Sequence, residues 1–567
     1  MSRLSDRQDH DADVIIVGAG PTGLMLANLL GDLEVPTLLI EGEDILIDYP
    51  RAVNMDDESM RTFQAVGLAE NVLGHVTQSQ WLRFFSANGR CLASIEPTTT
   101  EFGWTRRNAF IQPQIDTVAL DGLKRFSSVQ MIFSTKVTEI RQDSDGVTAS
   151  IEQGARQGTL RSRFLIACDG GKSSLRKKLG IEFGGFTDRS RWMVIDVAMD
   201  PLGTPASNLY CDPRRPYVSI SLPHGMRRFE FMMFDHEDEA EMLQPQMIAT
   251  LLERALPAGA NPADVRITRA RIYTHNARIA DRWRVDRVLL AGDAAHIMPV
   301  WQGQGYNSGL RDSFNLAWKL ALILRGVCEP DLLTSYQEER KTHAKAMIDI
   351  SVTVGRIFSP TNVFLARFRD VALLALNLVP PIKRYVTELR FKPMPKFDDG
   401  VVVHDPALGK RSPIGRIFTQ PMVERPDGTR MRLDDVIGNR FAVITWAADA
   451  AHWADDSAKT ILKRLDAVFI TVRPMEQLAT TKDLDPETML LGDANGILKI
   501  WFGRQDCATV VIRPDRVVAG ACFPANLSTM VMRLSEKLCM TSGANRSDAG
   551  SDAFPHCEEL LVGERRG

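Results

Sequence analysis

The N-terminal part of the chain alternates strand-like and helix-like patterns. Residues 13–17 (DVIIV) form a short β-branched apolar run, which predicts a buried parallel strand. The glycine-rich segment GAGPTG follows at 18–23, and apolar side chains then recur at helical spacing over 24–33. Residues 36–43 (PTLLIEGE) predict a second strand that ends in acidic residues. The pattern therefore predicts a strand–turn–helix–strand unit.

The strand-then-glycine pattern returns at 163–171 (RFLIACDGG) and at 287–296 (RVLLAGDAAH). A long helical pattern follows the second of these over 308–326, where it ends at a glycine. Between the two segments, residues 190–280 are rich in strand-like runs. We expect those runs to form a separate sheet layer.

The C-terminal third has a pattern of its own. Residues 380–415 mix prolines with charges and predict a linker. Strand-like runs follow at 441–449, 467–474 and 508–521, separated by helical or loop segments, which predicts a small α/β domain. Residues 541–567 are polar and rich in Gly, Ser and Asp, so we expect a loose tail.

The composition is that of an ordinary globular protein. Of 567 residues, 44% are apolar and 25% are charged, which excludes a mostly disordered chain. Lys plus Arg number 68 against 71 Asp plus Glu, a formal net charge of −3. Nothing in this balance requires a nucleic acid partner.

The cysteine spacing and the apolar stretches indicate where the protein is located in the cell and which metal or redox chemistry it lacks. Eight cysteines occur without a CxxC pair, which argues against a structural metal site and a dithiol redox centre. The N-terminal leader is polar, and the most membrane-like stretch, 363–379, is interrupted by charges and too short to span a bilayer. We therefore predict a cytoplasmic protein with free thiols and no bound metal, and we interpret 363–379 as a core or interface helix.

The glycine-rich turn carries the first functional signal. Gly18 permits the tight turn, Gly20 removes a side chain from the path of a pyrophosphate, and Gly23 lets helix and strand pack closely. Glu41 ends the second strand about 20 residues further on, where an acid binds ribose hydroxyls. The same carboxylate disfavours a 2′-phosphate, so FAD or NAD is expected at this turn.

Two further loops carry related signals. Gly292-Asp293 ends a predicted strand, and the loop through Gly303 and Gly305 opens a helix whose N-terminus has a partial positive charge. Backbone N–H groups there would stabilise a reduced, anionic flavin. Asp169 lies in the third segment, CDGGKSSLR, where it is either functional or only a turn residue.

Taken together and in this order, GAGPTG, CDGGKSSLR and GDAAHIMPVWQGQGYNSGL resemble the single-component flavin-dependent aromatic hydroxylases, the group A flavoprotein monooxygenases. Residues 49–68, 110–116 and 211–234 and a C-terminal VVIRPDRVVAG resemble the branch that acts on 3-(3-hydroxyphenyl)propionate. The resemblance implies an α/β fold with a Rossmann-like FAD-binding domain, an interleaved mixed-sheet substrate domain and a C-terminal thioredoxin-like domain. Without a CxxC that last domain is expected to be structural or oligomeric.

The resemblance also implies domain bounds and site residues. The FAD-binding domain is expected over 10–185 and, with long helices, 281–390; the substrate sheet over 186–280; the thioredoxin-like domain over 391–540; and a flexible tail over 541–567. Arg51 and Gln112 match positions that contact the FAD phosphates and ribityl chain, and Asp293 the ribityl side. The matched cofactor-binding set is Gly18, Gly20, Gly23, Glu41, Arg51, Gln112, Asp169, Gly292, Asp293, Gly303, Gly305 and Asn307.

The chain departs from the family pattern after GDAAH, where Pro299-Val300 precedes Trp301 and position 308 is Ser. Pro299, Trp301 and Tyr306 are the active-site candidates, with packing as the alternative for Trp301. His296, Tyr306 and His224 are candidates for a base only by residue type. No carboxylate-binding arginine is assigned among Arg214, Arg215, Arg227 and Arg228, most of which are expected to be solvated.

The resemblance implies one tightly bound FAD, transient NADH or NADPH, and a flavin hydroperoxide that transfers OH to a small phenolic substrate, ortho to its hydroxyl. Substrate, O2 and a second subunit of a homodimer are the expected partners, without nucleic acid or membrane. The preferred substrates are 3-(3-hydroxyphenyl)propionate and 3-hydroxycinnamate. A tailoring hydroxylase for a polyketide or another phenol is the alternative, and a non-enzymatic flavin-binding interaction protein is a third hypothesis.

Overall fold

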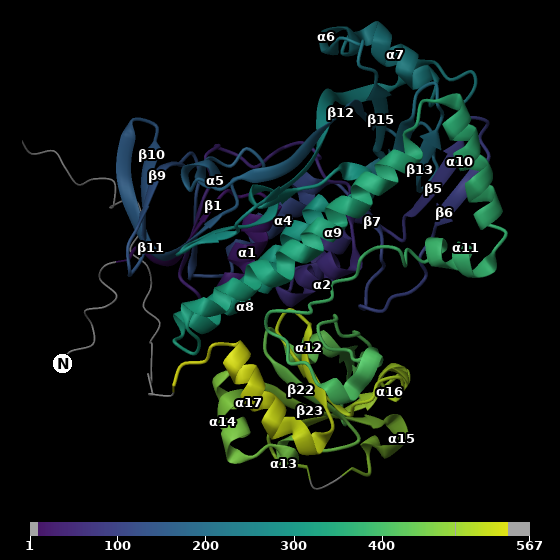
Figure 1. Cartoon of the computed structure of the whole chain (residues 1–567). Coiled ribbons are helices and arrows are strands. Elements are labelled where there is room, and N and C mark those ends of the chain that lie inside the picture. The colour runs from purple at the N-terminus through teal and green to yellow at the C-terminus, as the bar shows by residue number, and fades with distance from the viewer. Residues whose placement is uncertain (1–9, 482–483, 543–567) are drawn as a thin grey trace, which may run out of the picture.

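The computed structural model describes residues 10–481 and 484–542, and most of the predicted tail at 541–567 lies outside these residues. Figure 1 shows a large upper body, which holds two sheets and long helices, above a smaller C-terminal body. The predicted arrangement of a parallel sheet, a second sheet layer and a small C-terminal α/β domain is confirmed.

The parallel sheet is built from the apolar runs that the sequence marked as buried strands. Its order is β17 (Arg284–Val285), β18 (Val288–Leu290), β11 (Arg156–Ala167), β1 (Ala12–Val17), β2 (Thr37–Ile40) and β8 (Val129–Ile132), with β9 (Lys136–Gln142) and β10 (Val147–Gln153) as a hairpin on β11. Strands β18, β11, β1, β2 and β8 pair in parallel. Val14, Ile15 and Ile16 are fully buried, as expected for a strand covered on both faces.

Helices cover this sheet and hold the cavity-forming loops in place. The main ones are α1 (Pro21–Asp32), α2 (Asp57–Ala65), α3 (Ala69–Leu73), α4 (Gln112–Leu123), α5 (Ser174–Lys178), α8 (Gly305–Leu324) and α9 (Thr334–Phe358). Helix α8 packs on α1 and is buried over residues 306–323. Its charged residues Arg311, Asp312 and Lys319 are therefore buried as well, and each forms an ion pair. A small sheet of β3 (Asn54–Met55), β7 (Asn108–Phe110) and β4 (Val76–Gln78) lies beside α2 and α4.

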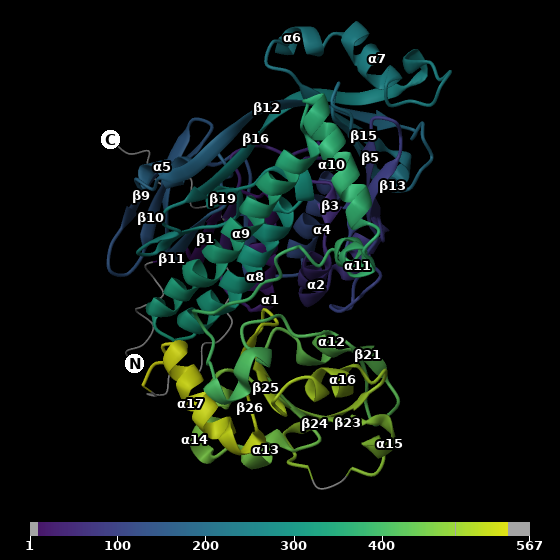
Figure 2. The same ribbon diagram turned by 45° about the vertical axis from the view of Figure 1, so that its right-hand side comes forward.

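The second sheet has the order β19 (His296–Ile297), β16 (Arg266–Ala280), β12 (Phe183–Ala198), β15 (Arg227–Met233), β14 (Tyr217–Ser221), β13 (Ala206–Cys211), β5 (Trp81–Ser86) and β6 (Cys91–Ile95). Strands β5 and β6 come from residues 81–95, far from the others in sequence. One face is covered by α6 (Glu239–Met242) and α7 (Pro245–Glu253), whose Leu251 and Leu252 pack on Phe229 and Phe231 (Figure 2). The other face is free to border the cavity described below.

Helices α10 (Val363–Leu376) and α11 (Pro380–Thr387) lie beside β5 and β6 on the outside of the molecule (Figure 1). Phe364 is 81% exposed and Phe368 73%, whereas Ala366 and Arg369 face inward. The core alternative for this stretch is therefore wrong, because its apolar side chains are the exposed ones; the interface alternative stays a prediction. Within the described residues, no helix has the length and apolar character needed to cross a membrane.

The C-terminal body is a mixed sheet of β21 (Arg430–Arg432), β20 (Met422–Glu424), β24 (Thr488–Asp493), β23 (Val468–Pro474), β22 (Ala442–Trp446), β25 (Thr509–Ile512) and β26 (Val518–Cys522). Helices α14 (Asp456–Arg464) and α17 (Leu527–Lys537) pack together beside it, and α12 (Leu433–Ile437), α13 (Ala450–Trp453), α15 (Met475–Leu478) and α16 (Ile497–Gly503) complete it (Figure 2). The seven cysteines in the described part of the chain are free thiols.

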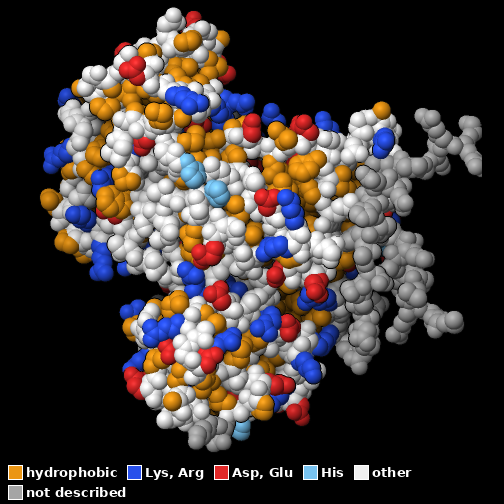
Figure 3. All heavy atoms as spheres, turned by 180° about the vertical axis from the view of Figure 1, so that it is seen from behind, with side chains coloured by type: hydrophobic (Ala, Val, Ile, Leu, Met, Phe, Trp, Pro, Cys, Tyr) orange, Lys and Arg blue, Asp and Glu red, His pale blue; other side chains and the backbone are white. Residues whose placement is uncertain are grey.

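Buried ion pairs join the two bodies. The guanidinium of Arg61 on α2 donates to both carboxylate oxygens of Asp434 on α12, at 2.5 and 2.7 Å. Arg513 donates to Glu339 of α9 at 2.7 and 2.9 Å. Figure 3 shows the indentation between the two bodies from behind, with charges of both signs interspersed on that face.

Candidate active site

A cavity of about 580 Å³ opens where the parallel sheet meets the second sheet. Its floor is formed by the turns after β1, β11 and β18 and by the loop 297–306, and its wall by strands β12, β14, β15 and β16. The volume lies within the range of small-molecule and cofactor sites. All three glycine motifs found in the sequence contribute residues to this one space.

The turn between β1 and α1 is shaped by its glycines. Gly18 has φ +105°, and a Cβ there would lie 2.4 Å from the Cys168 carbonyl oxygen; a Cβ on Gly23 would lie 2.0 Å from the Gly18 oxygen. Both positions therefore require glycine. Gly20 instead has nothing within 4 Å of a Cβ and borders the cavity at the N-terminus of α1. This open approach to free helix N–H groups fits a dinucleotide pyrophosphate.

Glu41 stands at the end of β2 beside this turn. Its carboxylate accepts hydrogen bonds from the backbone N–H groups of Ala19, at 2.7 Å, and Glu43, at 3.1 Å. The side chain is only partly buried and does not border the cavity itself. It is therefore held next to the glycine turn, at the side where an adenosine ribose would extend.

The Gly292-Asp293 turn faces the same space. Gly292 has φ +60°, and a Cβ there would lie 2.3 Å from Thr22 Oγ1, so the turn packs directly on α1. Asp293 borders the cavity and forms an ion pair at 3.3 Å with Arg51, whose side chain is 53% exposed. A half-exposed pair of this kind is weak, so both groups can exchange it for a ligand.

Gln112 and Asp169 differ in what they face. Gln112 borders the cavity, accepts from the N–H of Ala52 at 3.0 Å and donates to Asp116 at 3.0 Å. Asp169 accepts from the N–H of Leu175 at 3.1 Å, which organises the start of α5. Gly170 and Gly171 border the cavity, whereas Asp169 does not.

The loop before α8 brings backbone groups to the cavity. Gly303 has φ +60° and lies against Asn54, and Gly305 begins α8, so the free N–H groups of this helix point at the space. Asn307 is fully buried and does not border the cavity. Its amide donates to the carbonyls of Asn54 and Gly303 and accepts from Asp56 and Ser59, which fixes the loop.

Two of the three active-site candidates border the cavity. Trp301 lies edge-on to Trp192, at 5.0 Å between ring centroids, and Tyr306 is tilted against Phe110 at 4.8 Å. Pro299 is buried behind them and does not border the space. Trp301 therefore combines packing with a cavity-facing surface.

Sequence reasoning missed a polar group on the sheet wall. The Tyr273 hydroxyl on β16 donates to Glu230 on β15 at 2.9 Å, and both residues border the cavity. Burial raises the pKa of the Glu230 carboxyl, and the nearby Arg228 guanidinium, 3.8 Å away, partly opposes this. The alternation of RRFEF places Arg228 and Glu230 on one face, a signal that was present in the sequence.

The other histidine and arginine candidates lie elsewhere. His296 is buried with its Nε2 2.7 Å from Asp312, and His224 is an exposed partner of Gln114; neither borders the cavity. The expectation that most of the four arginines are solvated is wrong. Arg215, Arg227 and Arg228 are largely buried, paired with Glu237, Asp200 and Asp196 respectively. Arg214 is largely exposed although it is paired with Asp212.

Comparison with known proteins identifies the family to which the chain belongs. Residues 11–351 match the family model described as "FAD binding domain", and residues 415–537 match "HcaD C-terminal domain". A 3-(3-hydroxy-phenyl)propionate/3-hydroxycinnamic acid hydroxylase of Klebsiella pneumoniae (strain 342) is 50% identical over 537 residues, 94% of this chain and 96% of that protein. The protein of the same name from Escherichia coli (strain SMS-3-5 / SECEC) is 48% identical over 535 residues, 94% and 96% of the two chains.

Solved structures share the fold at low sequence identity. The flavin-dependent monooxygenase PieE superposes with a TM-score of 0.76 at 22% identity, covering 93% of this chain and 99% of that one. Aklavinone-11 hydroxylase superposes with a TM-score of 0.73 at 23% identity, with the same coverage.

The chain belongs to the FAD-binding monooxygenase family, and the three glycine turns that border the cavity all lie within the residues that match the FAD-binding model. It is an FAD-dependent aromatic hydroxylase, 50% identical over 94% of its length to a protein named for 3-(3-hydroxy-phenyl)propionate and 3-hydroxycinnamic acid. Among the described residues, no group of three or more His, Cys, Asp or Glu side chains converges to form a metal site.

Proposed function

We propose that this flavoprotein hydroxylates 3-(3-hydroxyphenyl)propionate and 3-hydroxycinnamate ortho to the phenolic hydroxyl, with NADH or NADPH and O2 as co-substrates. The observation that carries the proposal is the 50% identity, over 94% of the chain, to a hydroxylase named for these two acids. The cavity supports it, because the glycine turns suited to a cofactor and the polar Tyr273–Glu230 pair face the same space.

The residues that would hold FAD follow from the geometry. The turn that contains Gly18, Gly20 and Gly23 would let the pyrophosphate approach the backbone at the start of α1. Glu41, held beside this turn, would bind the hydroxyls of the adenosine ribose. Asp293, Arg51 and Gln112 would contact the phosphates and ribityl chain, and the backbone of 303–305 the isoalloxazine. When bound, the flavin accepts hydride from NAD(P)H and activates O2 for transfer of one oxygen atom to the aromatic ring.

The side chains of the sheet wall would prepare the phenol. A phenol that donates its proton to the Tyr273 oxygen gains electron density on its ring, because Tyr273 in turn donates to the Glu230 carboxylate. Glu230 thus holds the far end of the proton relay at Oε2. Trp192, Leu209 and Ile220 line the same wall with apolar surface, which keeps water from the reacting atoms.

A tailoring hydroxylase of a polyketide or another bulky phenol is the second candidate. It is favoured by an apolar side chamber of about 200 Å³ that adjoins the cavity.

The resemblance further implies a homodimer in the cytoplasm and the domain bounds given above. These stay predictions, the dimer being checked by light scattering during gel filtration.

The test is NADH and NADPH consumption by FAD-loaded protein with and without 3-(3-hydroxyphenyl)propionate, with products identified by mass. Strong stimulation with a gain of one oxygen is the expected result. The control compound is 3-phenylpropionate, which lacks the hydroxyl and is expected to gain no oxygen. Stimulation that yields only H2O2, or none at all while bulkier phenols are hydroxylated, would favour the second candidate. NADH turnover that does not depend on oxygen would contradict monooxygenase chemistry.

A further inference from the structure

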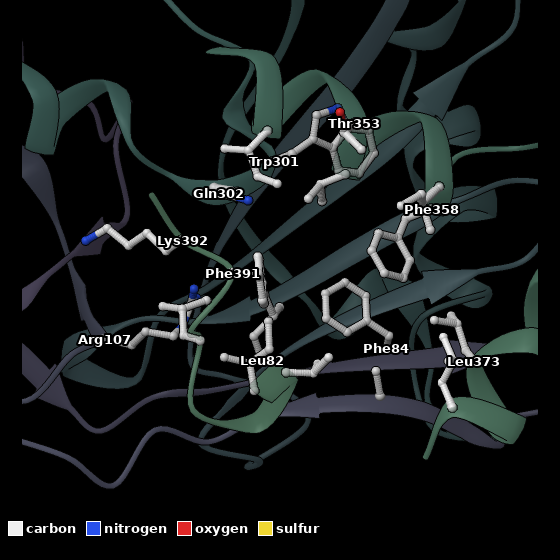
Figure 4. Close-up of a pocket in the computed structure, with 18 of the residues that line it drawn as sticks. Leu82, Phe84, Arg107, Trp301, Gln302, Thr353, Phe358, Leu373, Phe391 and Lys392 are labelled. Atoms are coloured by element: carbon white, nitrogen blue, oxygen red, sulfur yellow. The ribbon is translucent and has the colours of Figure 1, made fainter. Parts of the chain in front are cut away.

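An apolar side chamber adjoins the main cavity and ends at a buried arginine. Its walls come from β5, β6 and helices α9 to α11 (Figure 4). In Figure 4, Phe358 and Leu373 lie at one end of the chamber, and Arg107 and Lys392 at the other. The residues that border both spaces are Asn54, Leu82, Arg107, Trp301, Gln302 and Gln304. Arg107 therefore stands at the junction of the chamber with the flavin-side loop.

Arg107 is buried without a carboxylate partner. Its side chain belongs to a residue that is 7% exposed, and its Nε donates to the carbonyl oxygen of Gln80 at 3.3 Å. No ion pair with Arg107 is found within residues 10–481 and 484–542. Burial lowers the pKa of the guanidinium to about 10, with no acidic group opposing that effect. The two terminal nitrogens carry four N–H donors that are left for another acceptor.

The other cations that border the two spaces are either paired or exposed. Arg228 is bound to Asp196 at 2.7 Å, Lys392 to Asp56 at 2.7 Å, and Arg106 lies 3.6 Å from Asp57. Arg269 lies 3.6 Å from Asp196, and Arg51 is paired with Asp293. Arg271 and Lys383 are exposed, so water satisfies them. Arg107 is thus buried, borders the cavity and has a positive charge with no acidic partner among the described residues.

Gln80 holds the guanidinium in place. Its backbone N–H donates to the carbonyl of Arg107 at 3.1 Å, and its carbonyl accepts from Arg107 Nε. The Gln80 side chain accepts from Ser207 Oγ at 2.9 Å and donates to the Ser221 carbonyl, which ties it to β13 and β14. A positioned, desolvated guanidinium is suited to bidentate binding of a carboxylate.

We infer that Arg107 binds the side-chain carboxylate of a phenolic acid substrate, while the phenol ring lies between the flavin loop and Tyr273. The inference rests on the proposed function and adds the residue that selects acids over neutral phenols. A bound carboxylate would supply the negative counter-charge that no acidic side chain in the described part of the chain provides to Arg107. The short hydrocarbon linker between the carboxylate and the phenol ring would lie on the apolar surface of Leu82 and Trp301.

The test compares binding of an acid and its neutral counterpart, without NAD(P)H so that no turnover occurs. Dissociation constants of 3-(3-hydroxyphenyl)propionate and 3-(3-hydroxyphenyl)propan-1-ol are measured from the change in flavin absorbance of the FAD-loaded protein. The variants are Arg107→Met, which keeps length and removes charge, and Arg107→Lys, which keeps charge and removes the planar fork. Arg271→Met, a matched change at an exposed arginine of the cavity rim, is the control.

Wild type is expected to prefer the acid. Arg107→Met should weaken acid binding about 10- to 100-fold and leave alcohol binding within about threefold, with Arg107→Lys intermediate. The inference is overturned if Arg107→Met weakens both ligands equally, if Arg271→Met causes the acid-selective loss, or if wild type shows no preference. Because the readout is a ratio on one protein sample, a partly misfolded variant does not mimic the result, and Arg107→Lys supplies a second test.

Failure of the proposed function gives a different result. If wild type binds the acid through Arg107 but product analysis shows no oxygen gain, the substrate assignment fails and the anchor stands. If wild type hydroxylates the acid while Arg107→Met keeps the acid preference, the anchor fails and the substrate assignment stands.

Discussion

The hydroxyl of Tyr273 donates a 2.9 Å hydrogen bond to Glu230, across strand β12, which separates the strands that carry them. Burial raises the pKa of both groups, that of Tyr273 well above its usual value. Tyr273 therefore stays protonated throughout the physiological range and keeps its proton on the Glu230 side. Its oxygen is left to accept a hydrogen bond from a phenol in the cavity, and Tyr273 passes its own proton to Glu230 when it takes the phenol's proton.

Tyr273→Phe should lower kcat about 10- to 100-fold with FAD content unchanged, because the acceptor for the phenol proton is lost. Glu230→Gln should remove the acid limb of the kcat/KM profile, since protonation of Glu230 ends the relay in wild type. The measurement is product formation against pH. Tyr217→Phe on β14 is the matched control, because Tyr217 does not border the cavity. Equal losses in both Phe variants would contradict the assigned role.

Asp293→Ala should lose FAD while the fold is retained, because Asp293 borders the cavity and, among the residues that the structure describes, its side chain forms only the weak ion pair with Arg51. The ratio of flavin to protein absorbance after gel filtration measures this, with thermal unfolding as the check on folding. Asp281→Ala, which changes an exposed aspartate outside the cavity, should stay yellow. A fully yellow Asp293→Ala protein would show that this turn is misplaced.

Asp434→Ala should lower the free energy of unfolding by about 3–5 kcal/mol, because it leaves Arg61 and Arg516 buried without their counter-charge. Denaturant unfolding followed by tryptophan fluorescence measures the change. The neighbouring Asp435 is exposed, so Asp435→Ala should change this free energy by less than about 1 kcal/mol. Similar losses in the two variants would show that the interface pair does not stabilise the protein.

Asp116 should make stability depend on pH. Burial raises the pKa of its carboxyl to about 7, whereas an unfolded aspartate titrates near pH 4. Between roughly pH 4 and 7 the native protein keeps a proton that the unfolded chain has lost, so the free energy of unfolding falls as pH rises. Asp116→Asn should abolish this contribution and be relatively more stable at pH 8 than at pH 5. Parallel melting-temperature profiles of wild type and variant from pH 4 to 8 would contradict the shift.

Local sequence signals predicted the glycine turns that form the floor of the cavity. Gly18, Gly23, Gly292 and Gly303 each have a structural reason that is encoded within a few residues, namely a positive φ or a close backbone contact. The sequence was less informative about Pro299 and Asn307, which lie next to cavity-lining residues but face away from the cavity. Adjacency in the chain does not specify which side of a loop faces a ligand.

By itself, the sequence determined the parallel sheet, its glycine turns, the separate strand-rich layer and the C-terminal α/β domain, because these depend on periodicity and turn chemistry over short distances. Only the tertiary structure decided the chemistry of the cavity wall. The register of β12 and β15 places Asp196 opposite Arg228. The ion pair between them makes Arg228 unsuitable for binding a substrate carboxylate. Tyr273 on β16 and Arg107, which immediately precedes β7, border one cavity although they lie 166 residues apart in the sequence. Strand order and register, set by burial of whole faces, bring together side chains that no local pattern connects.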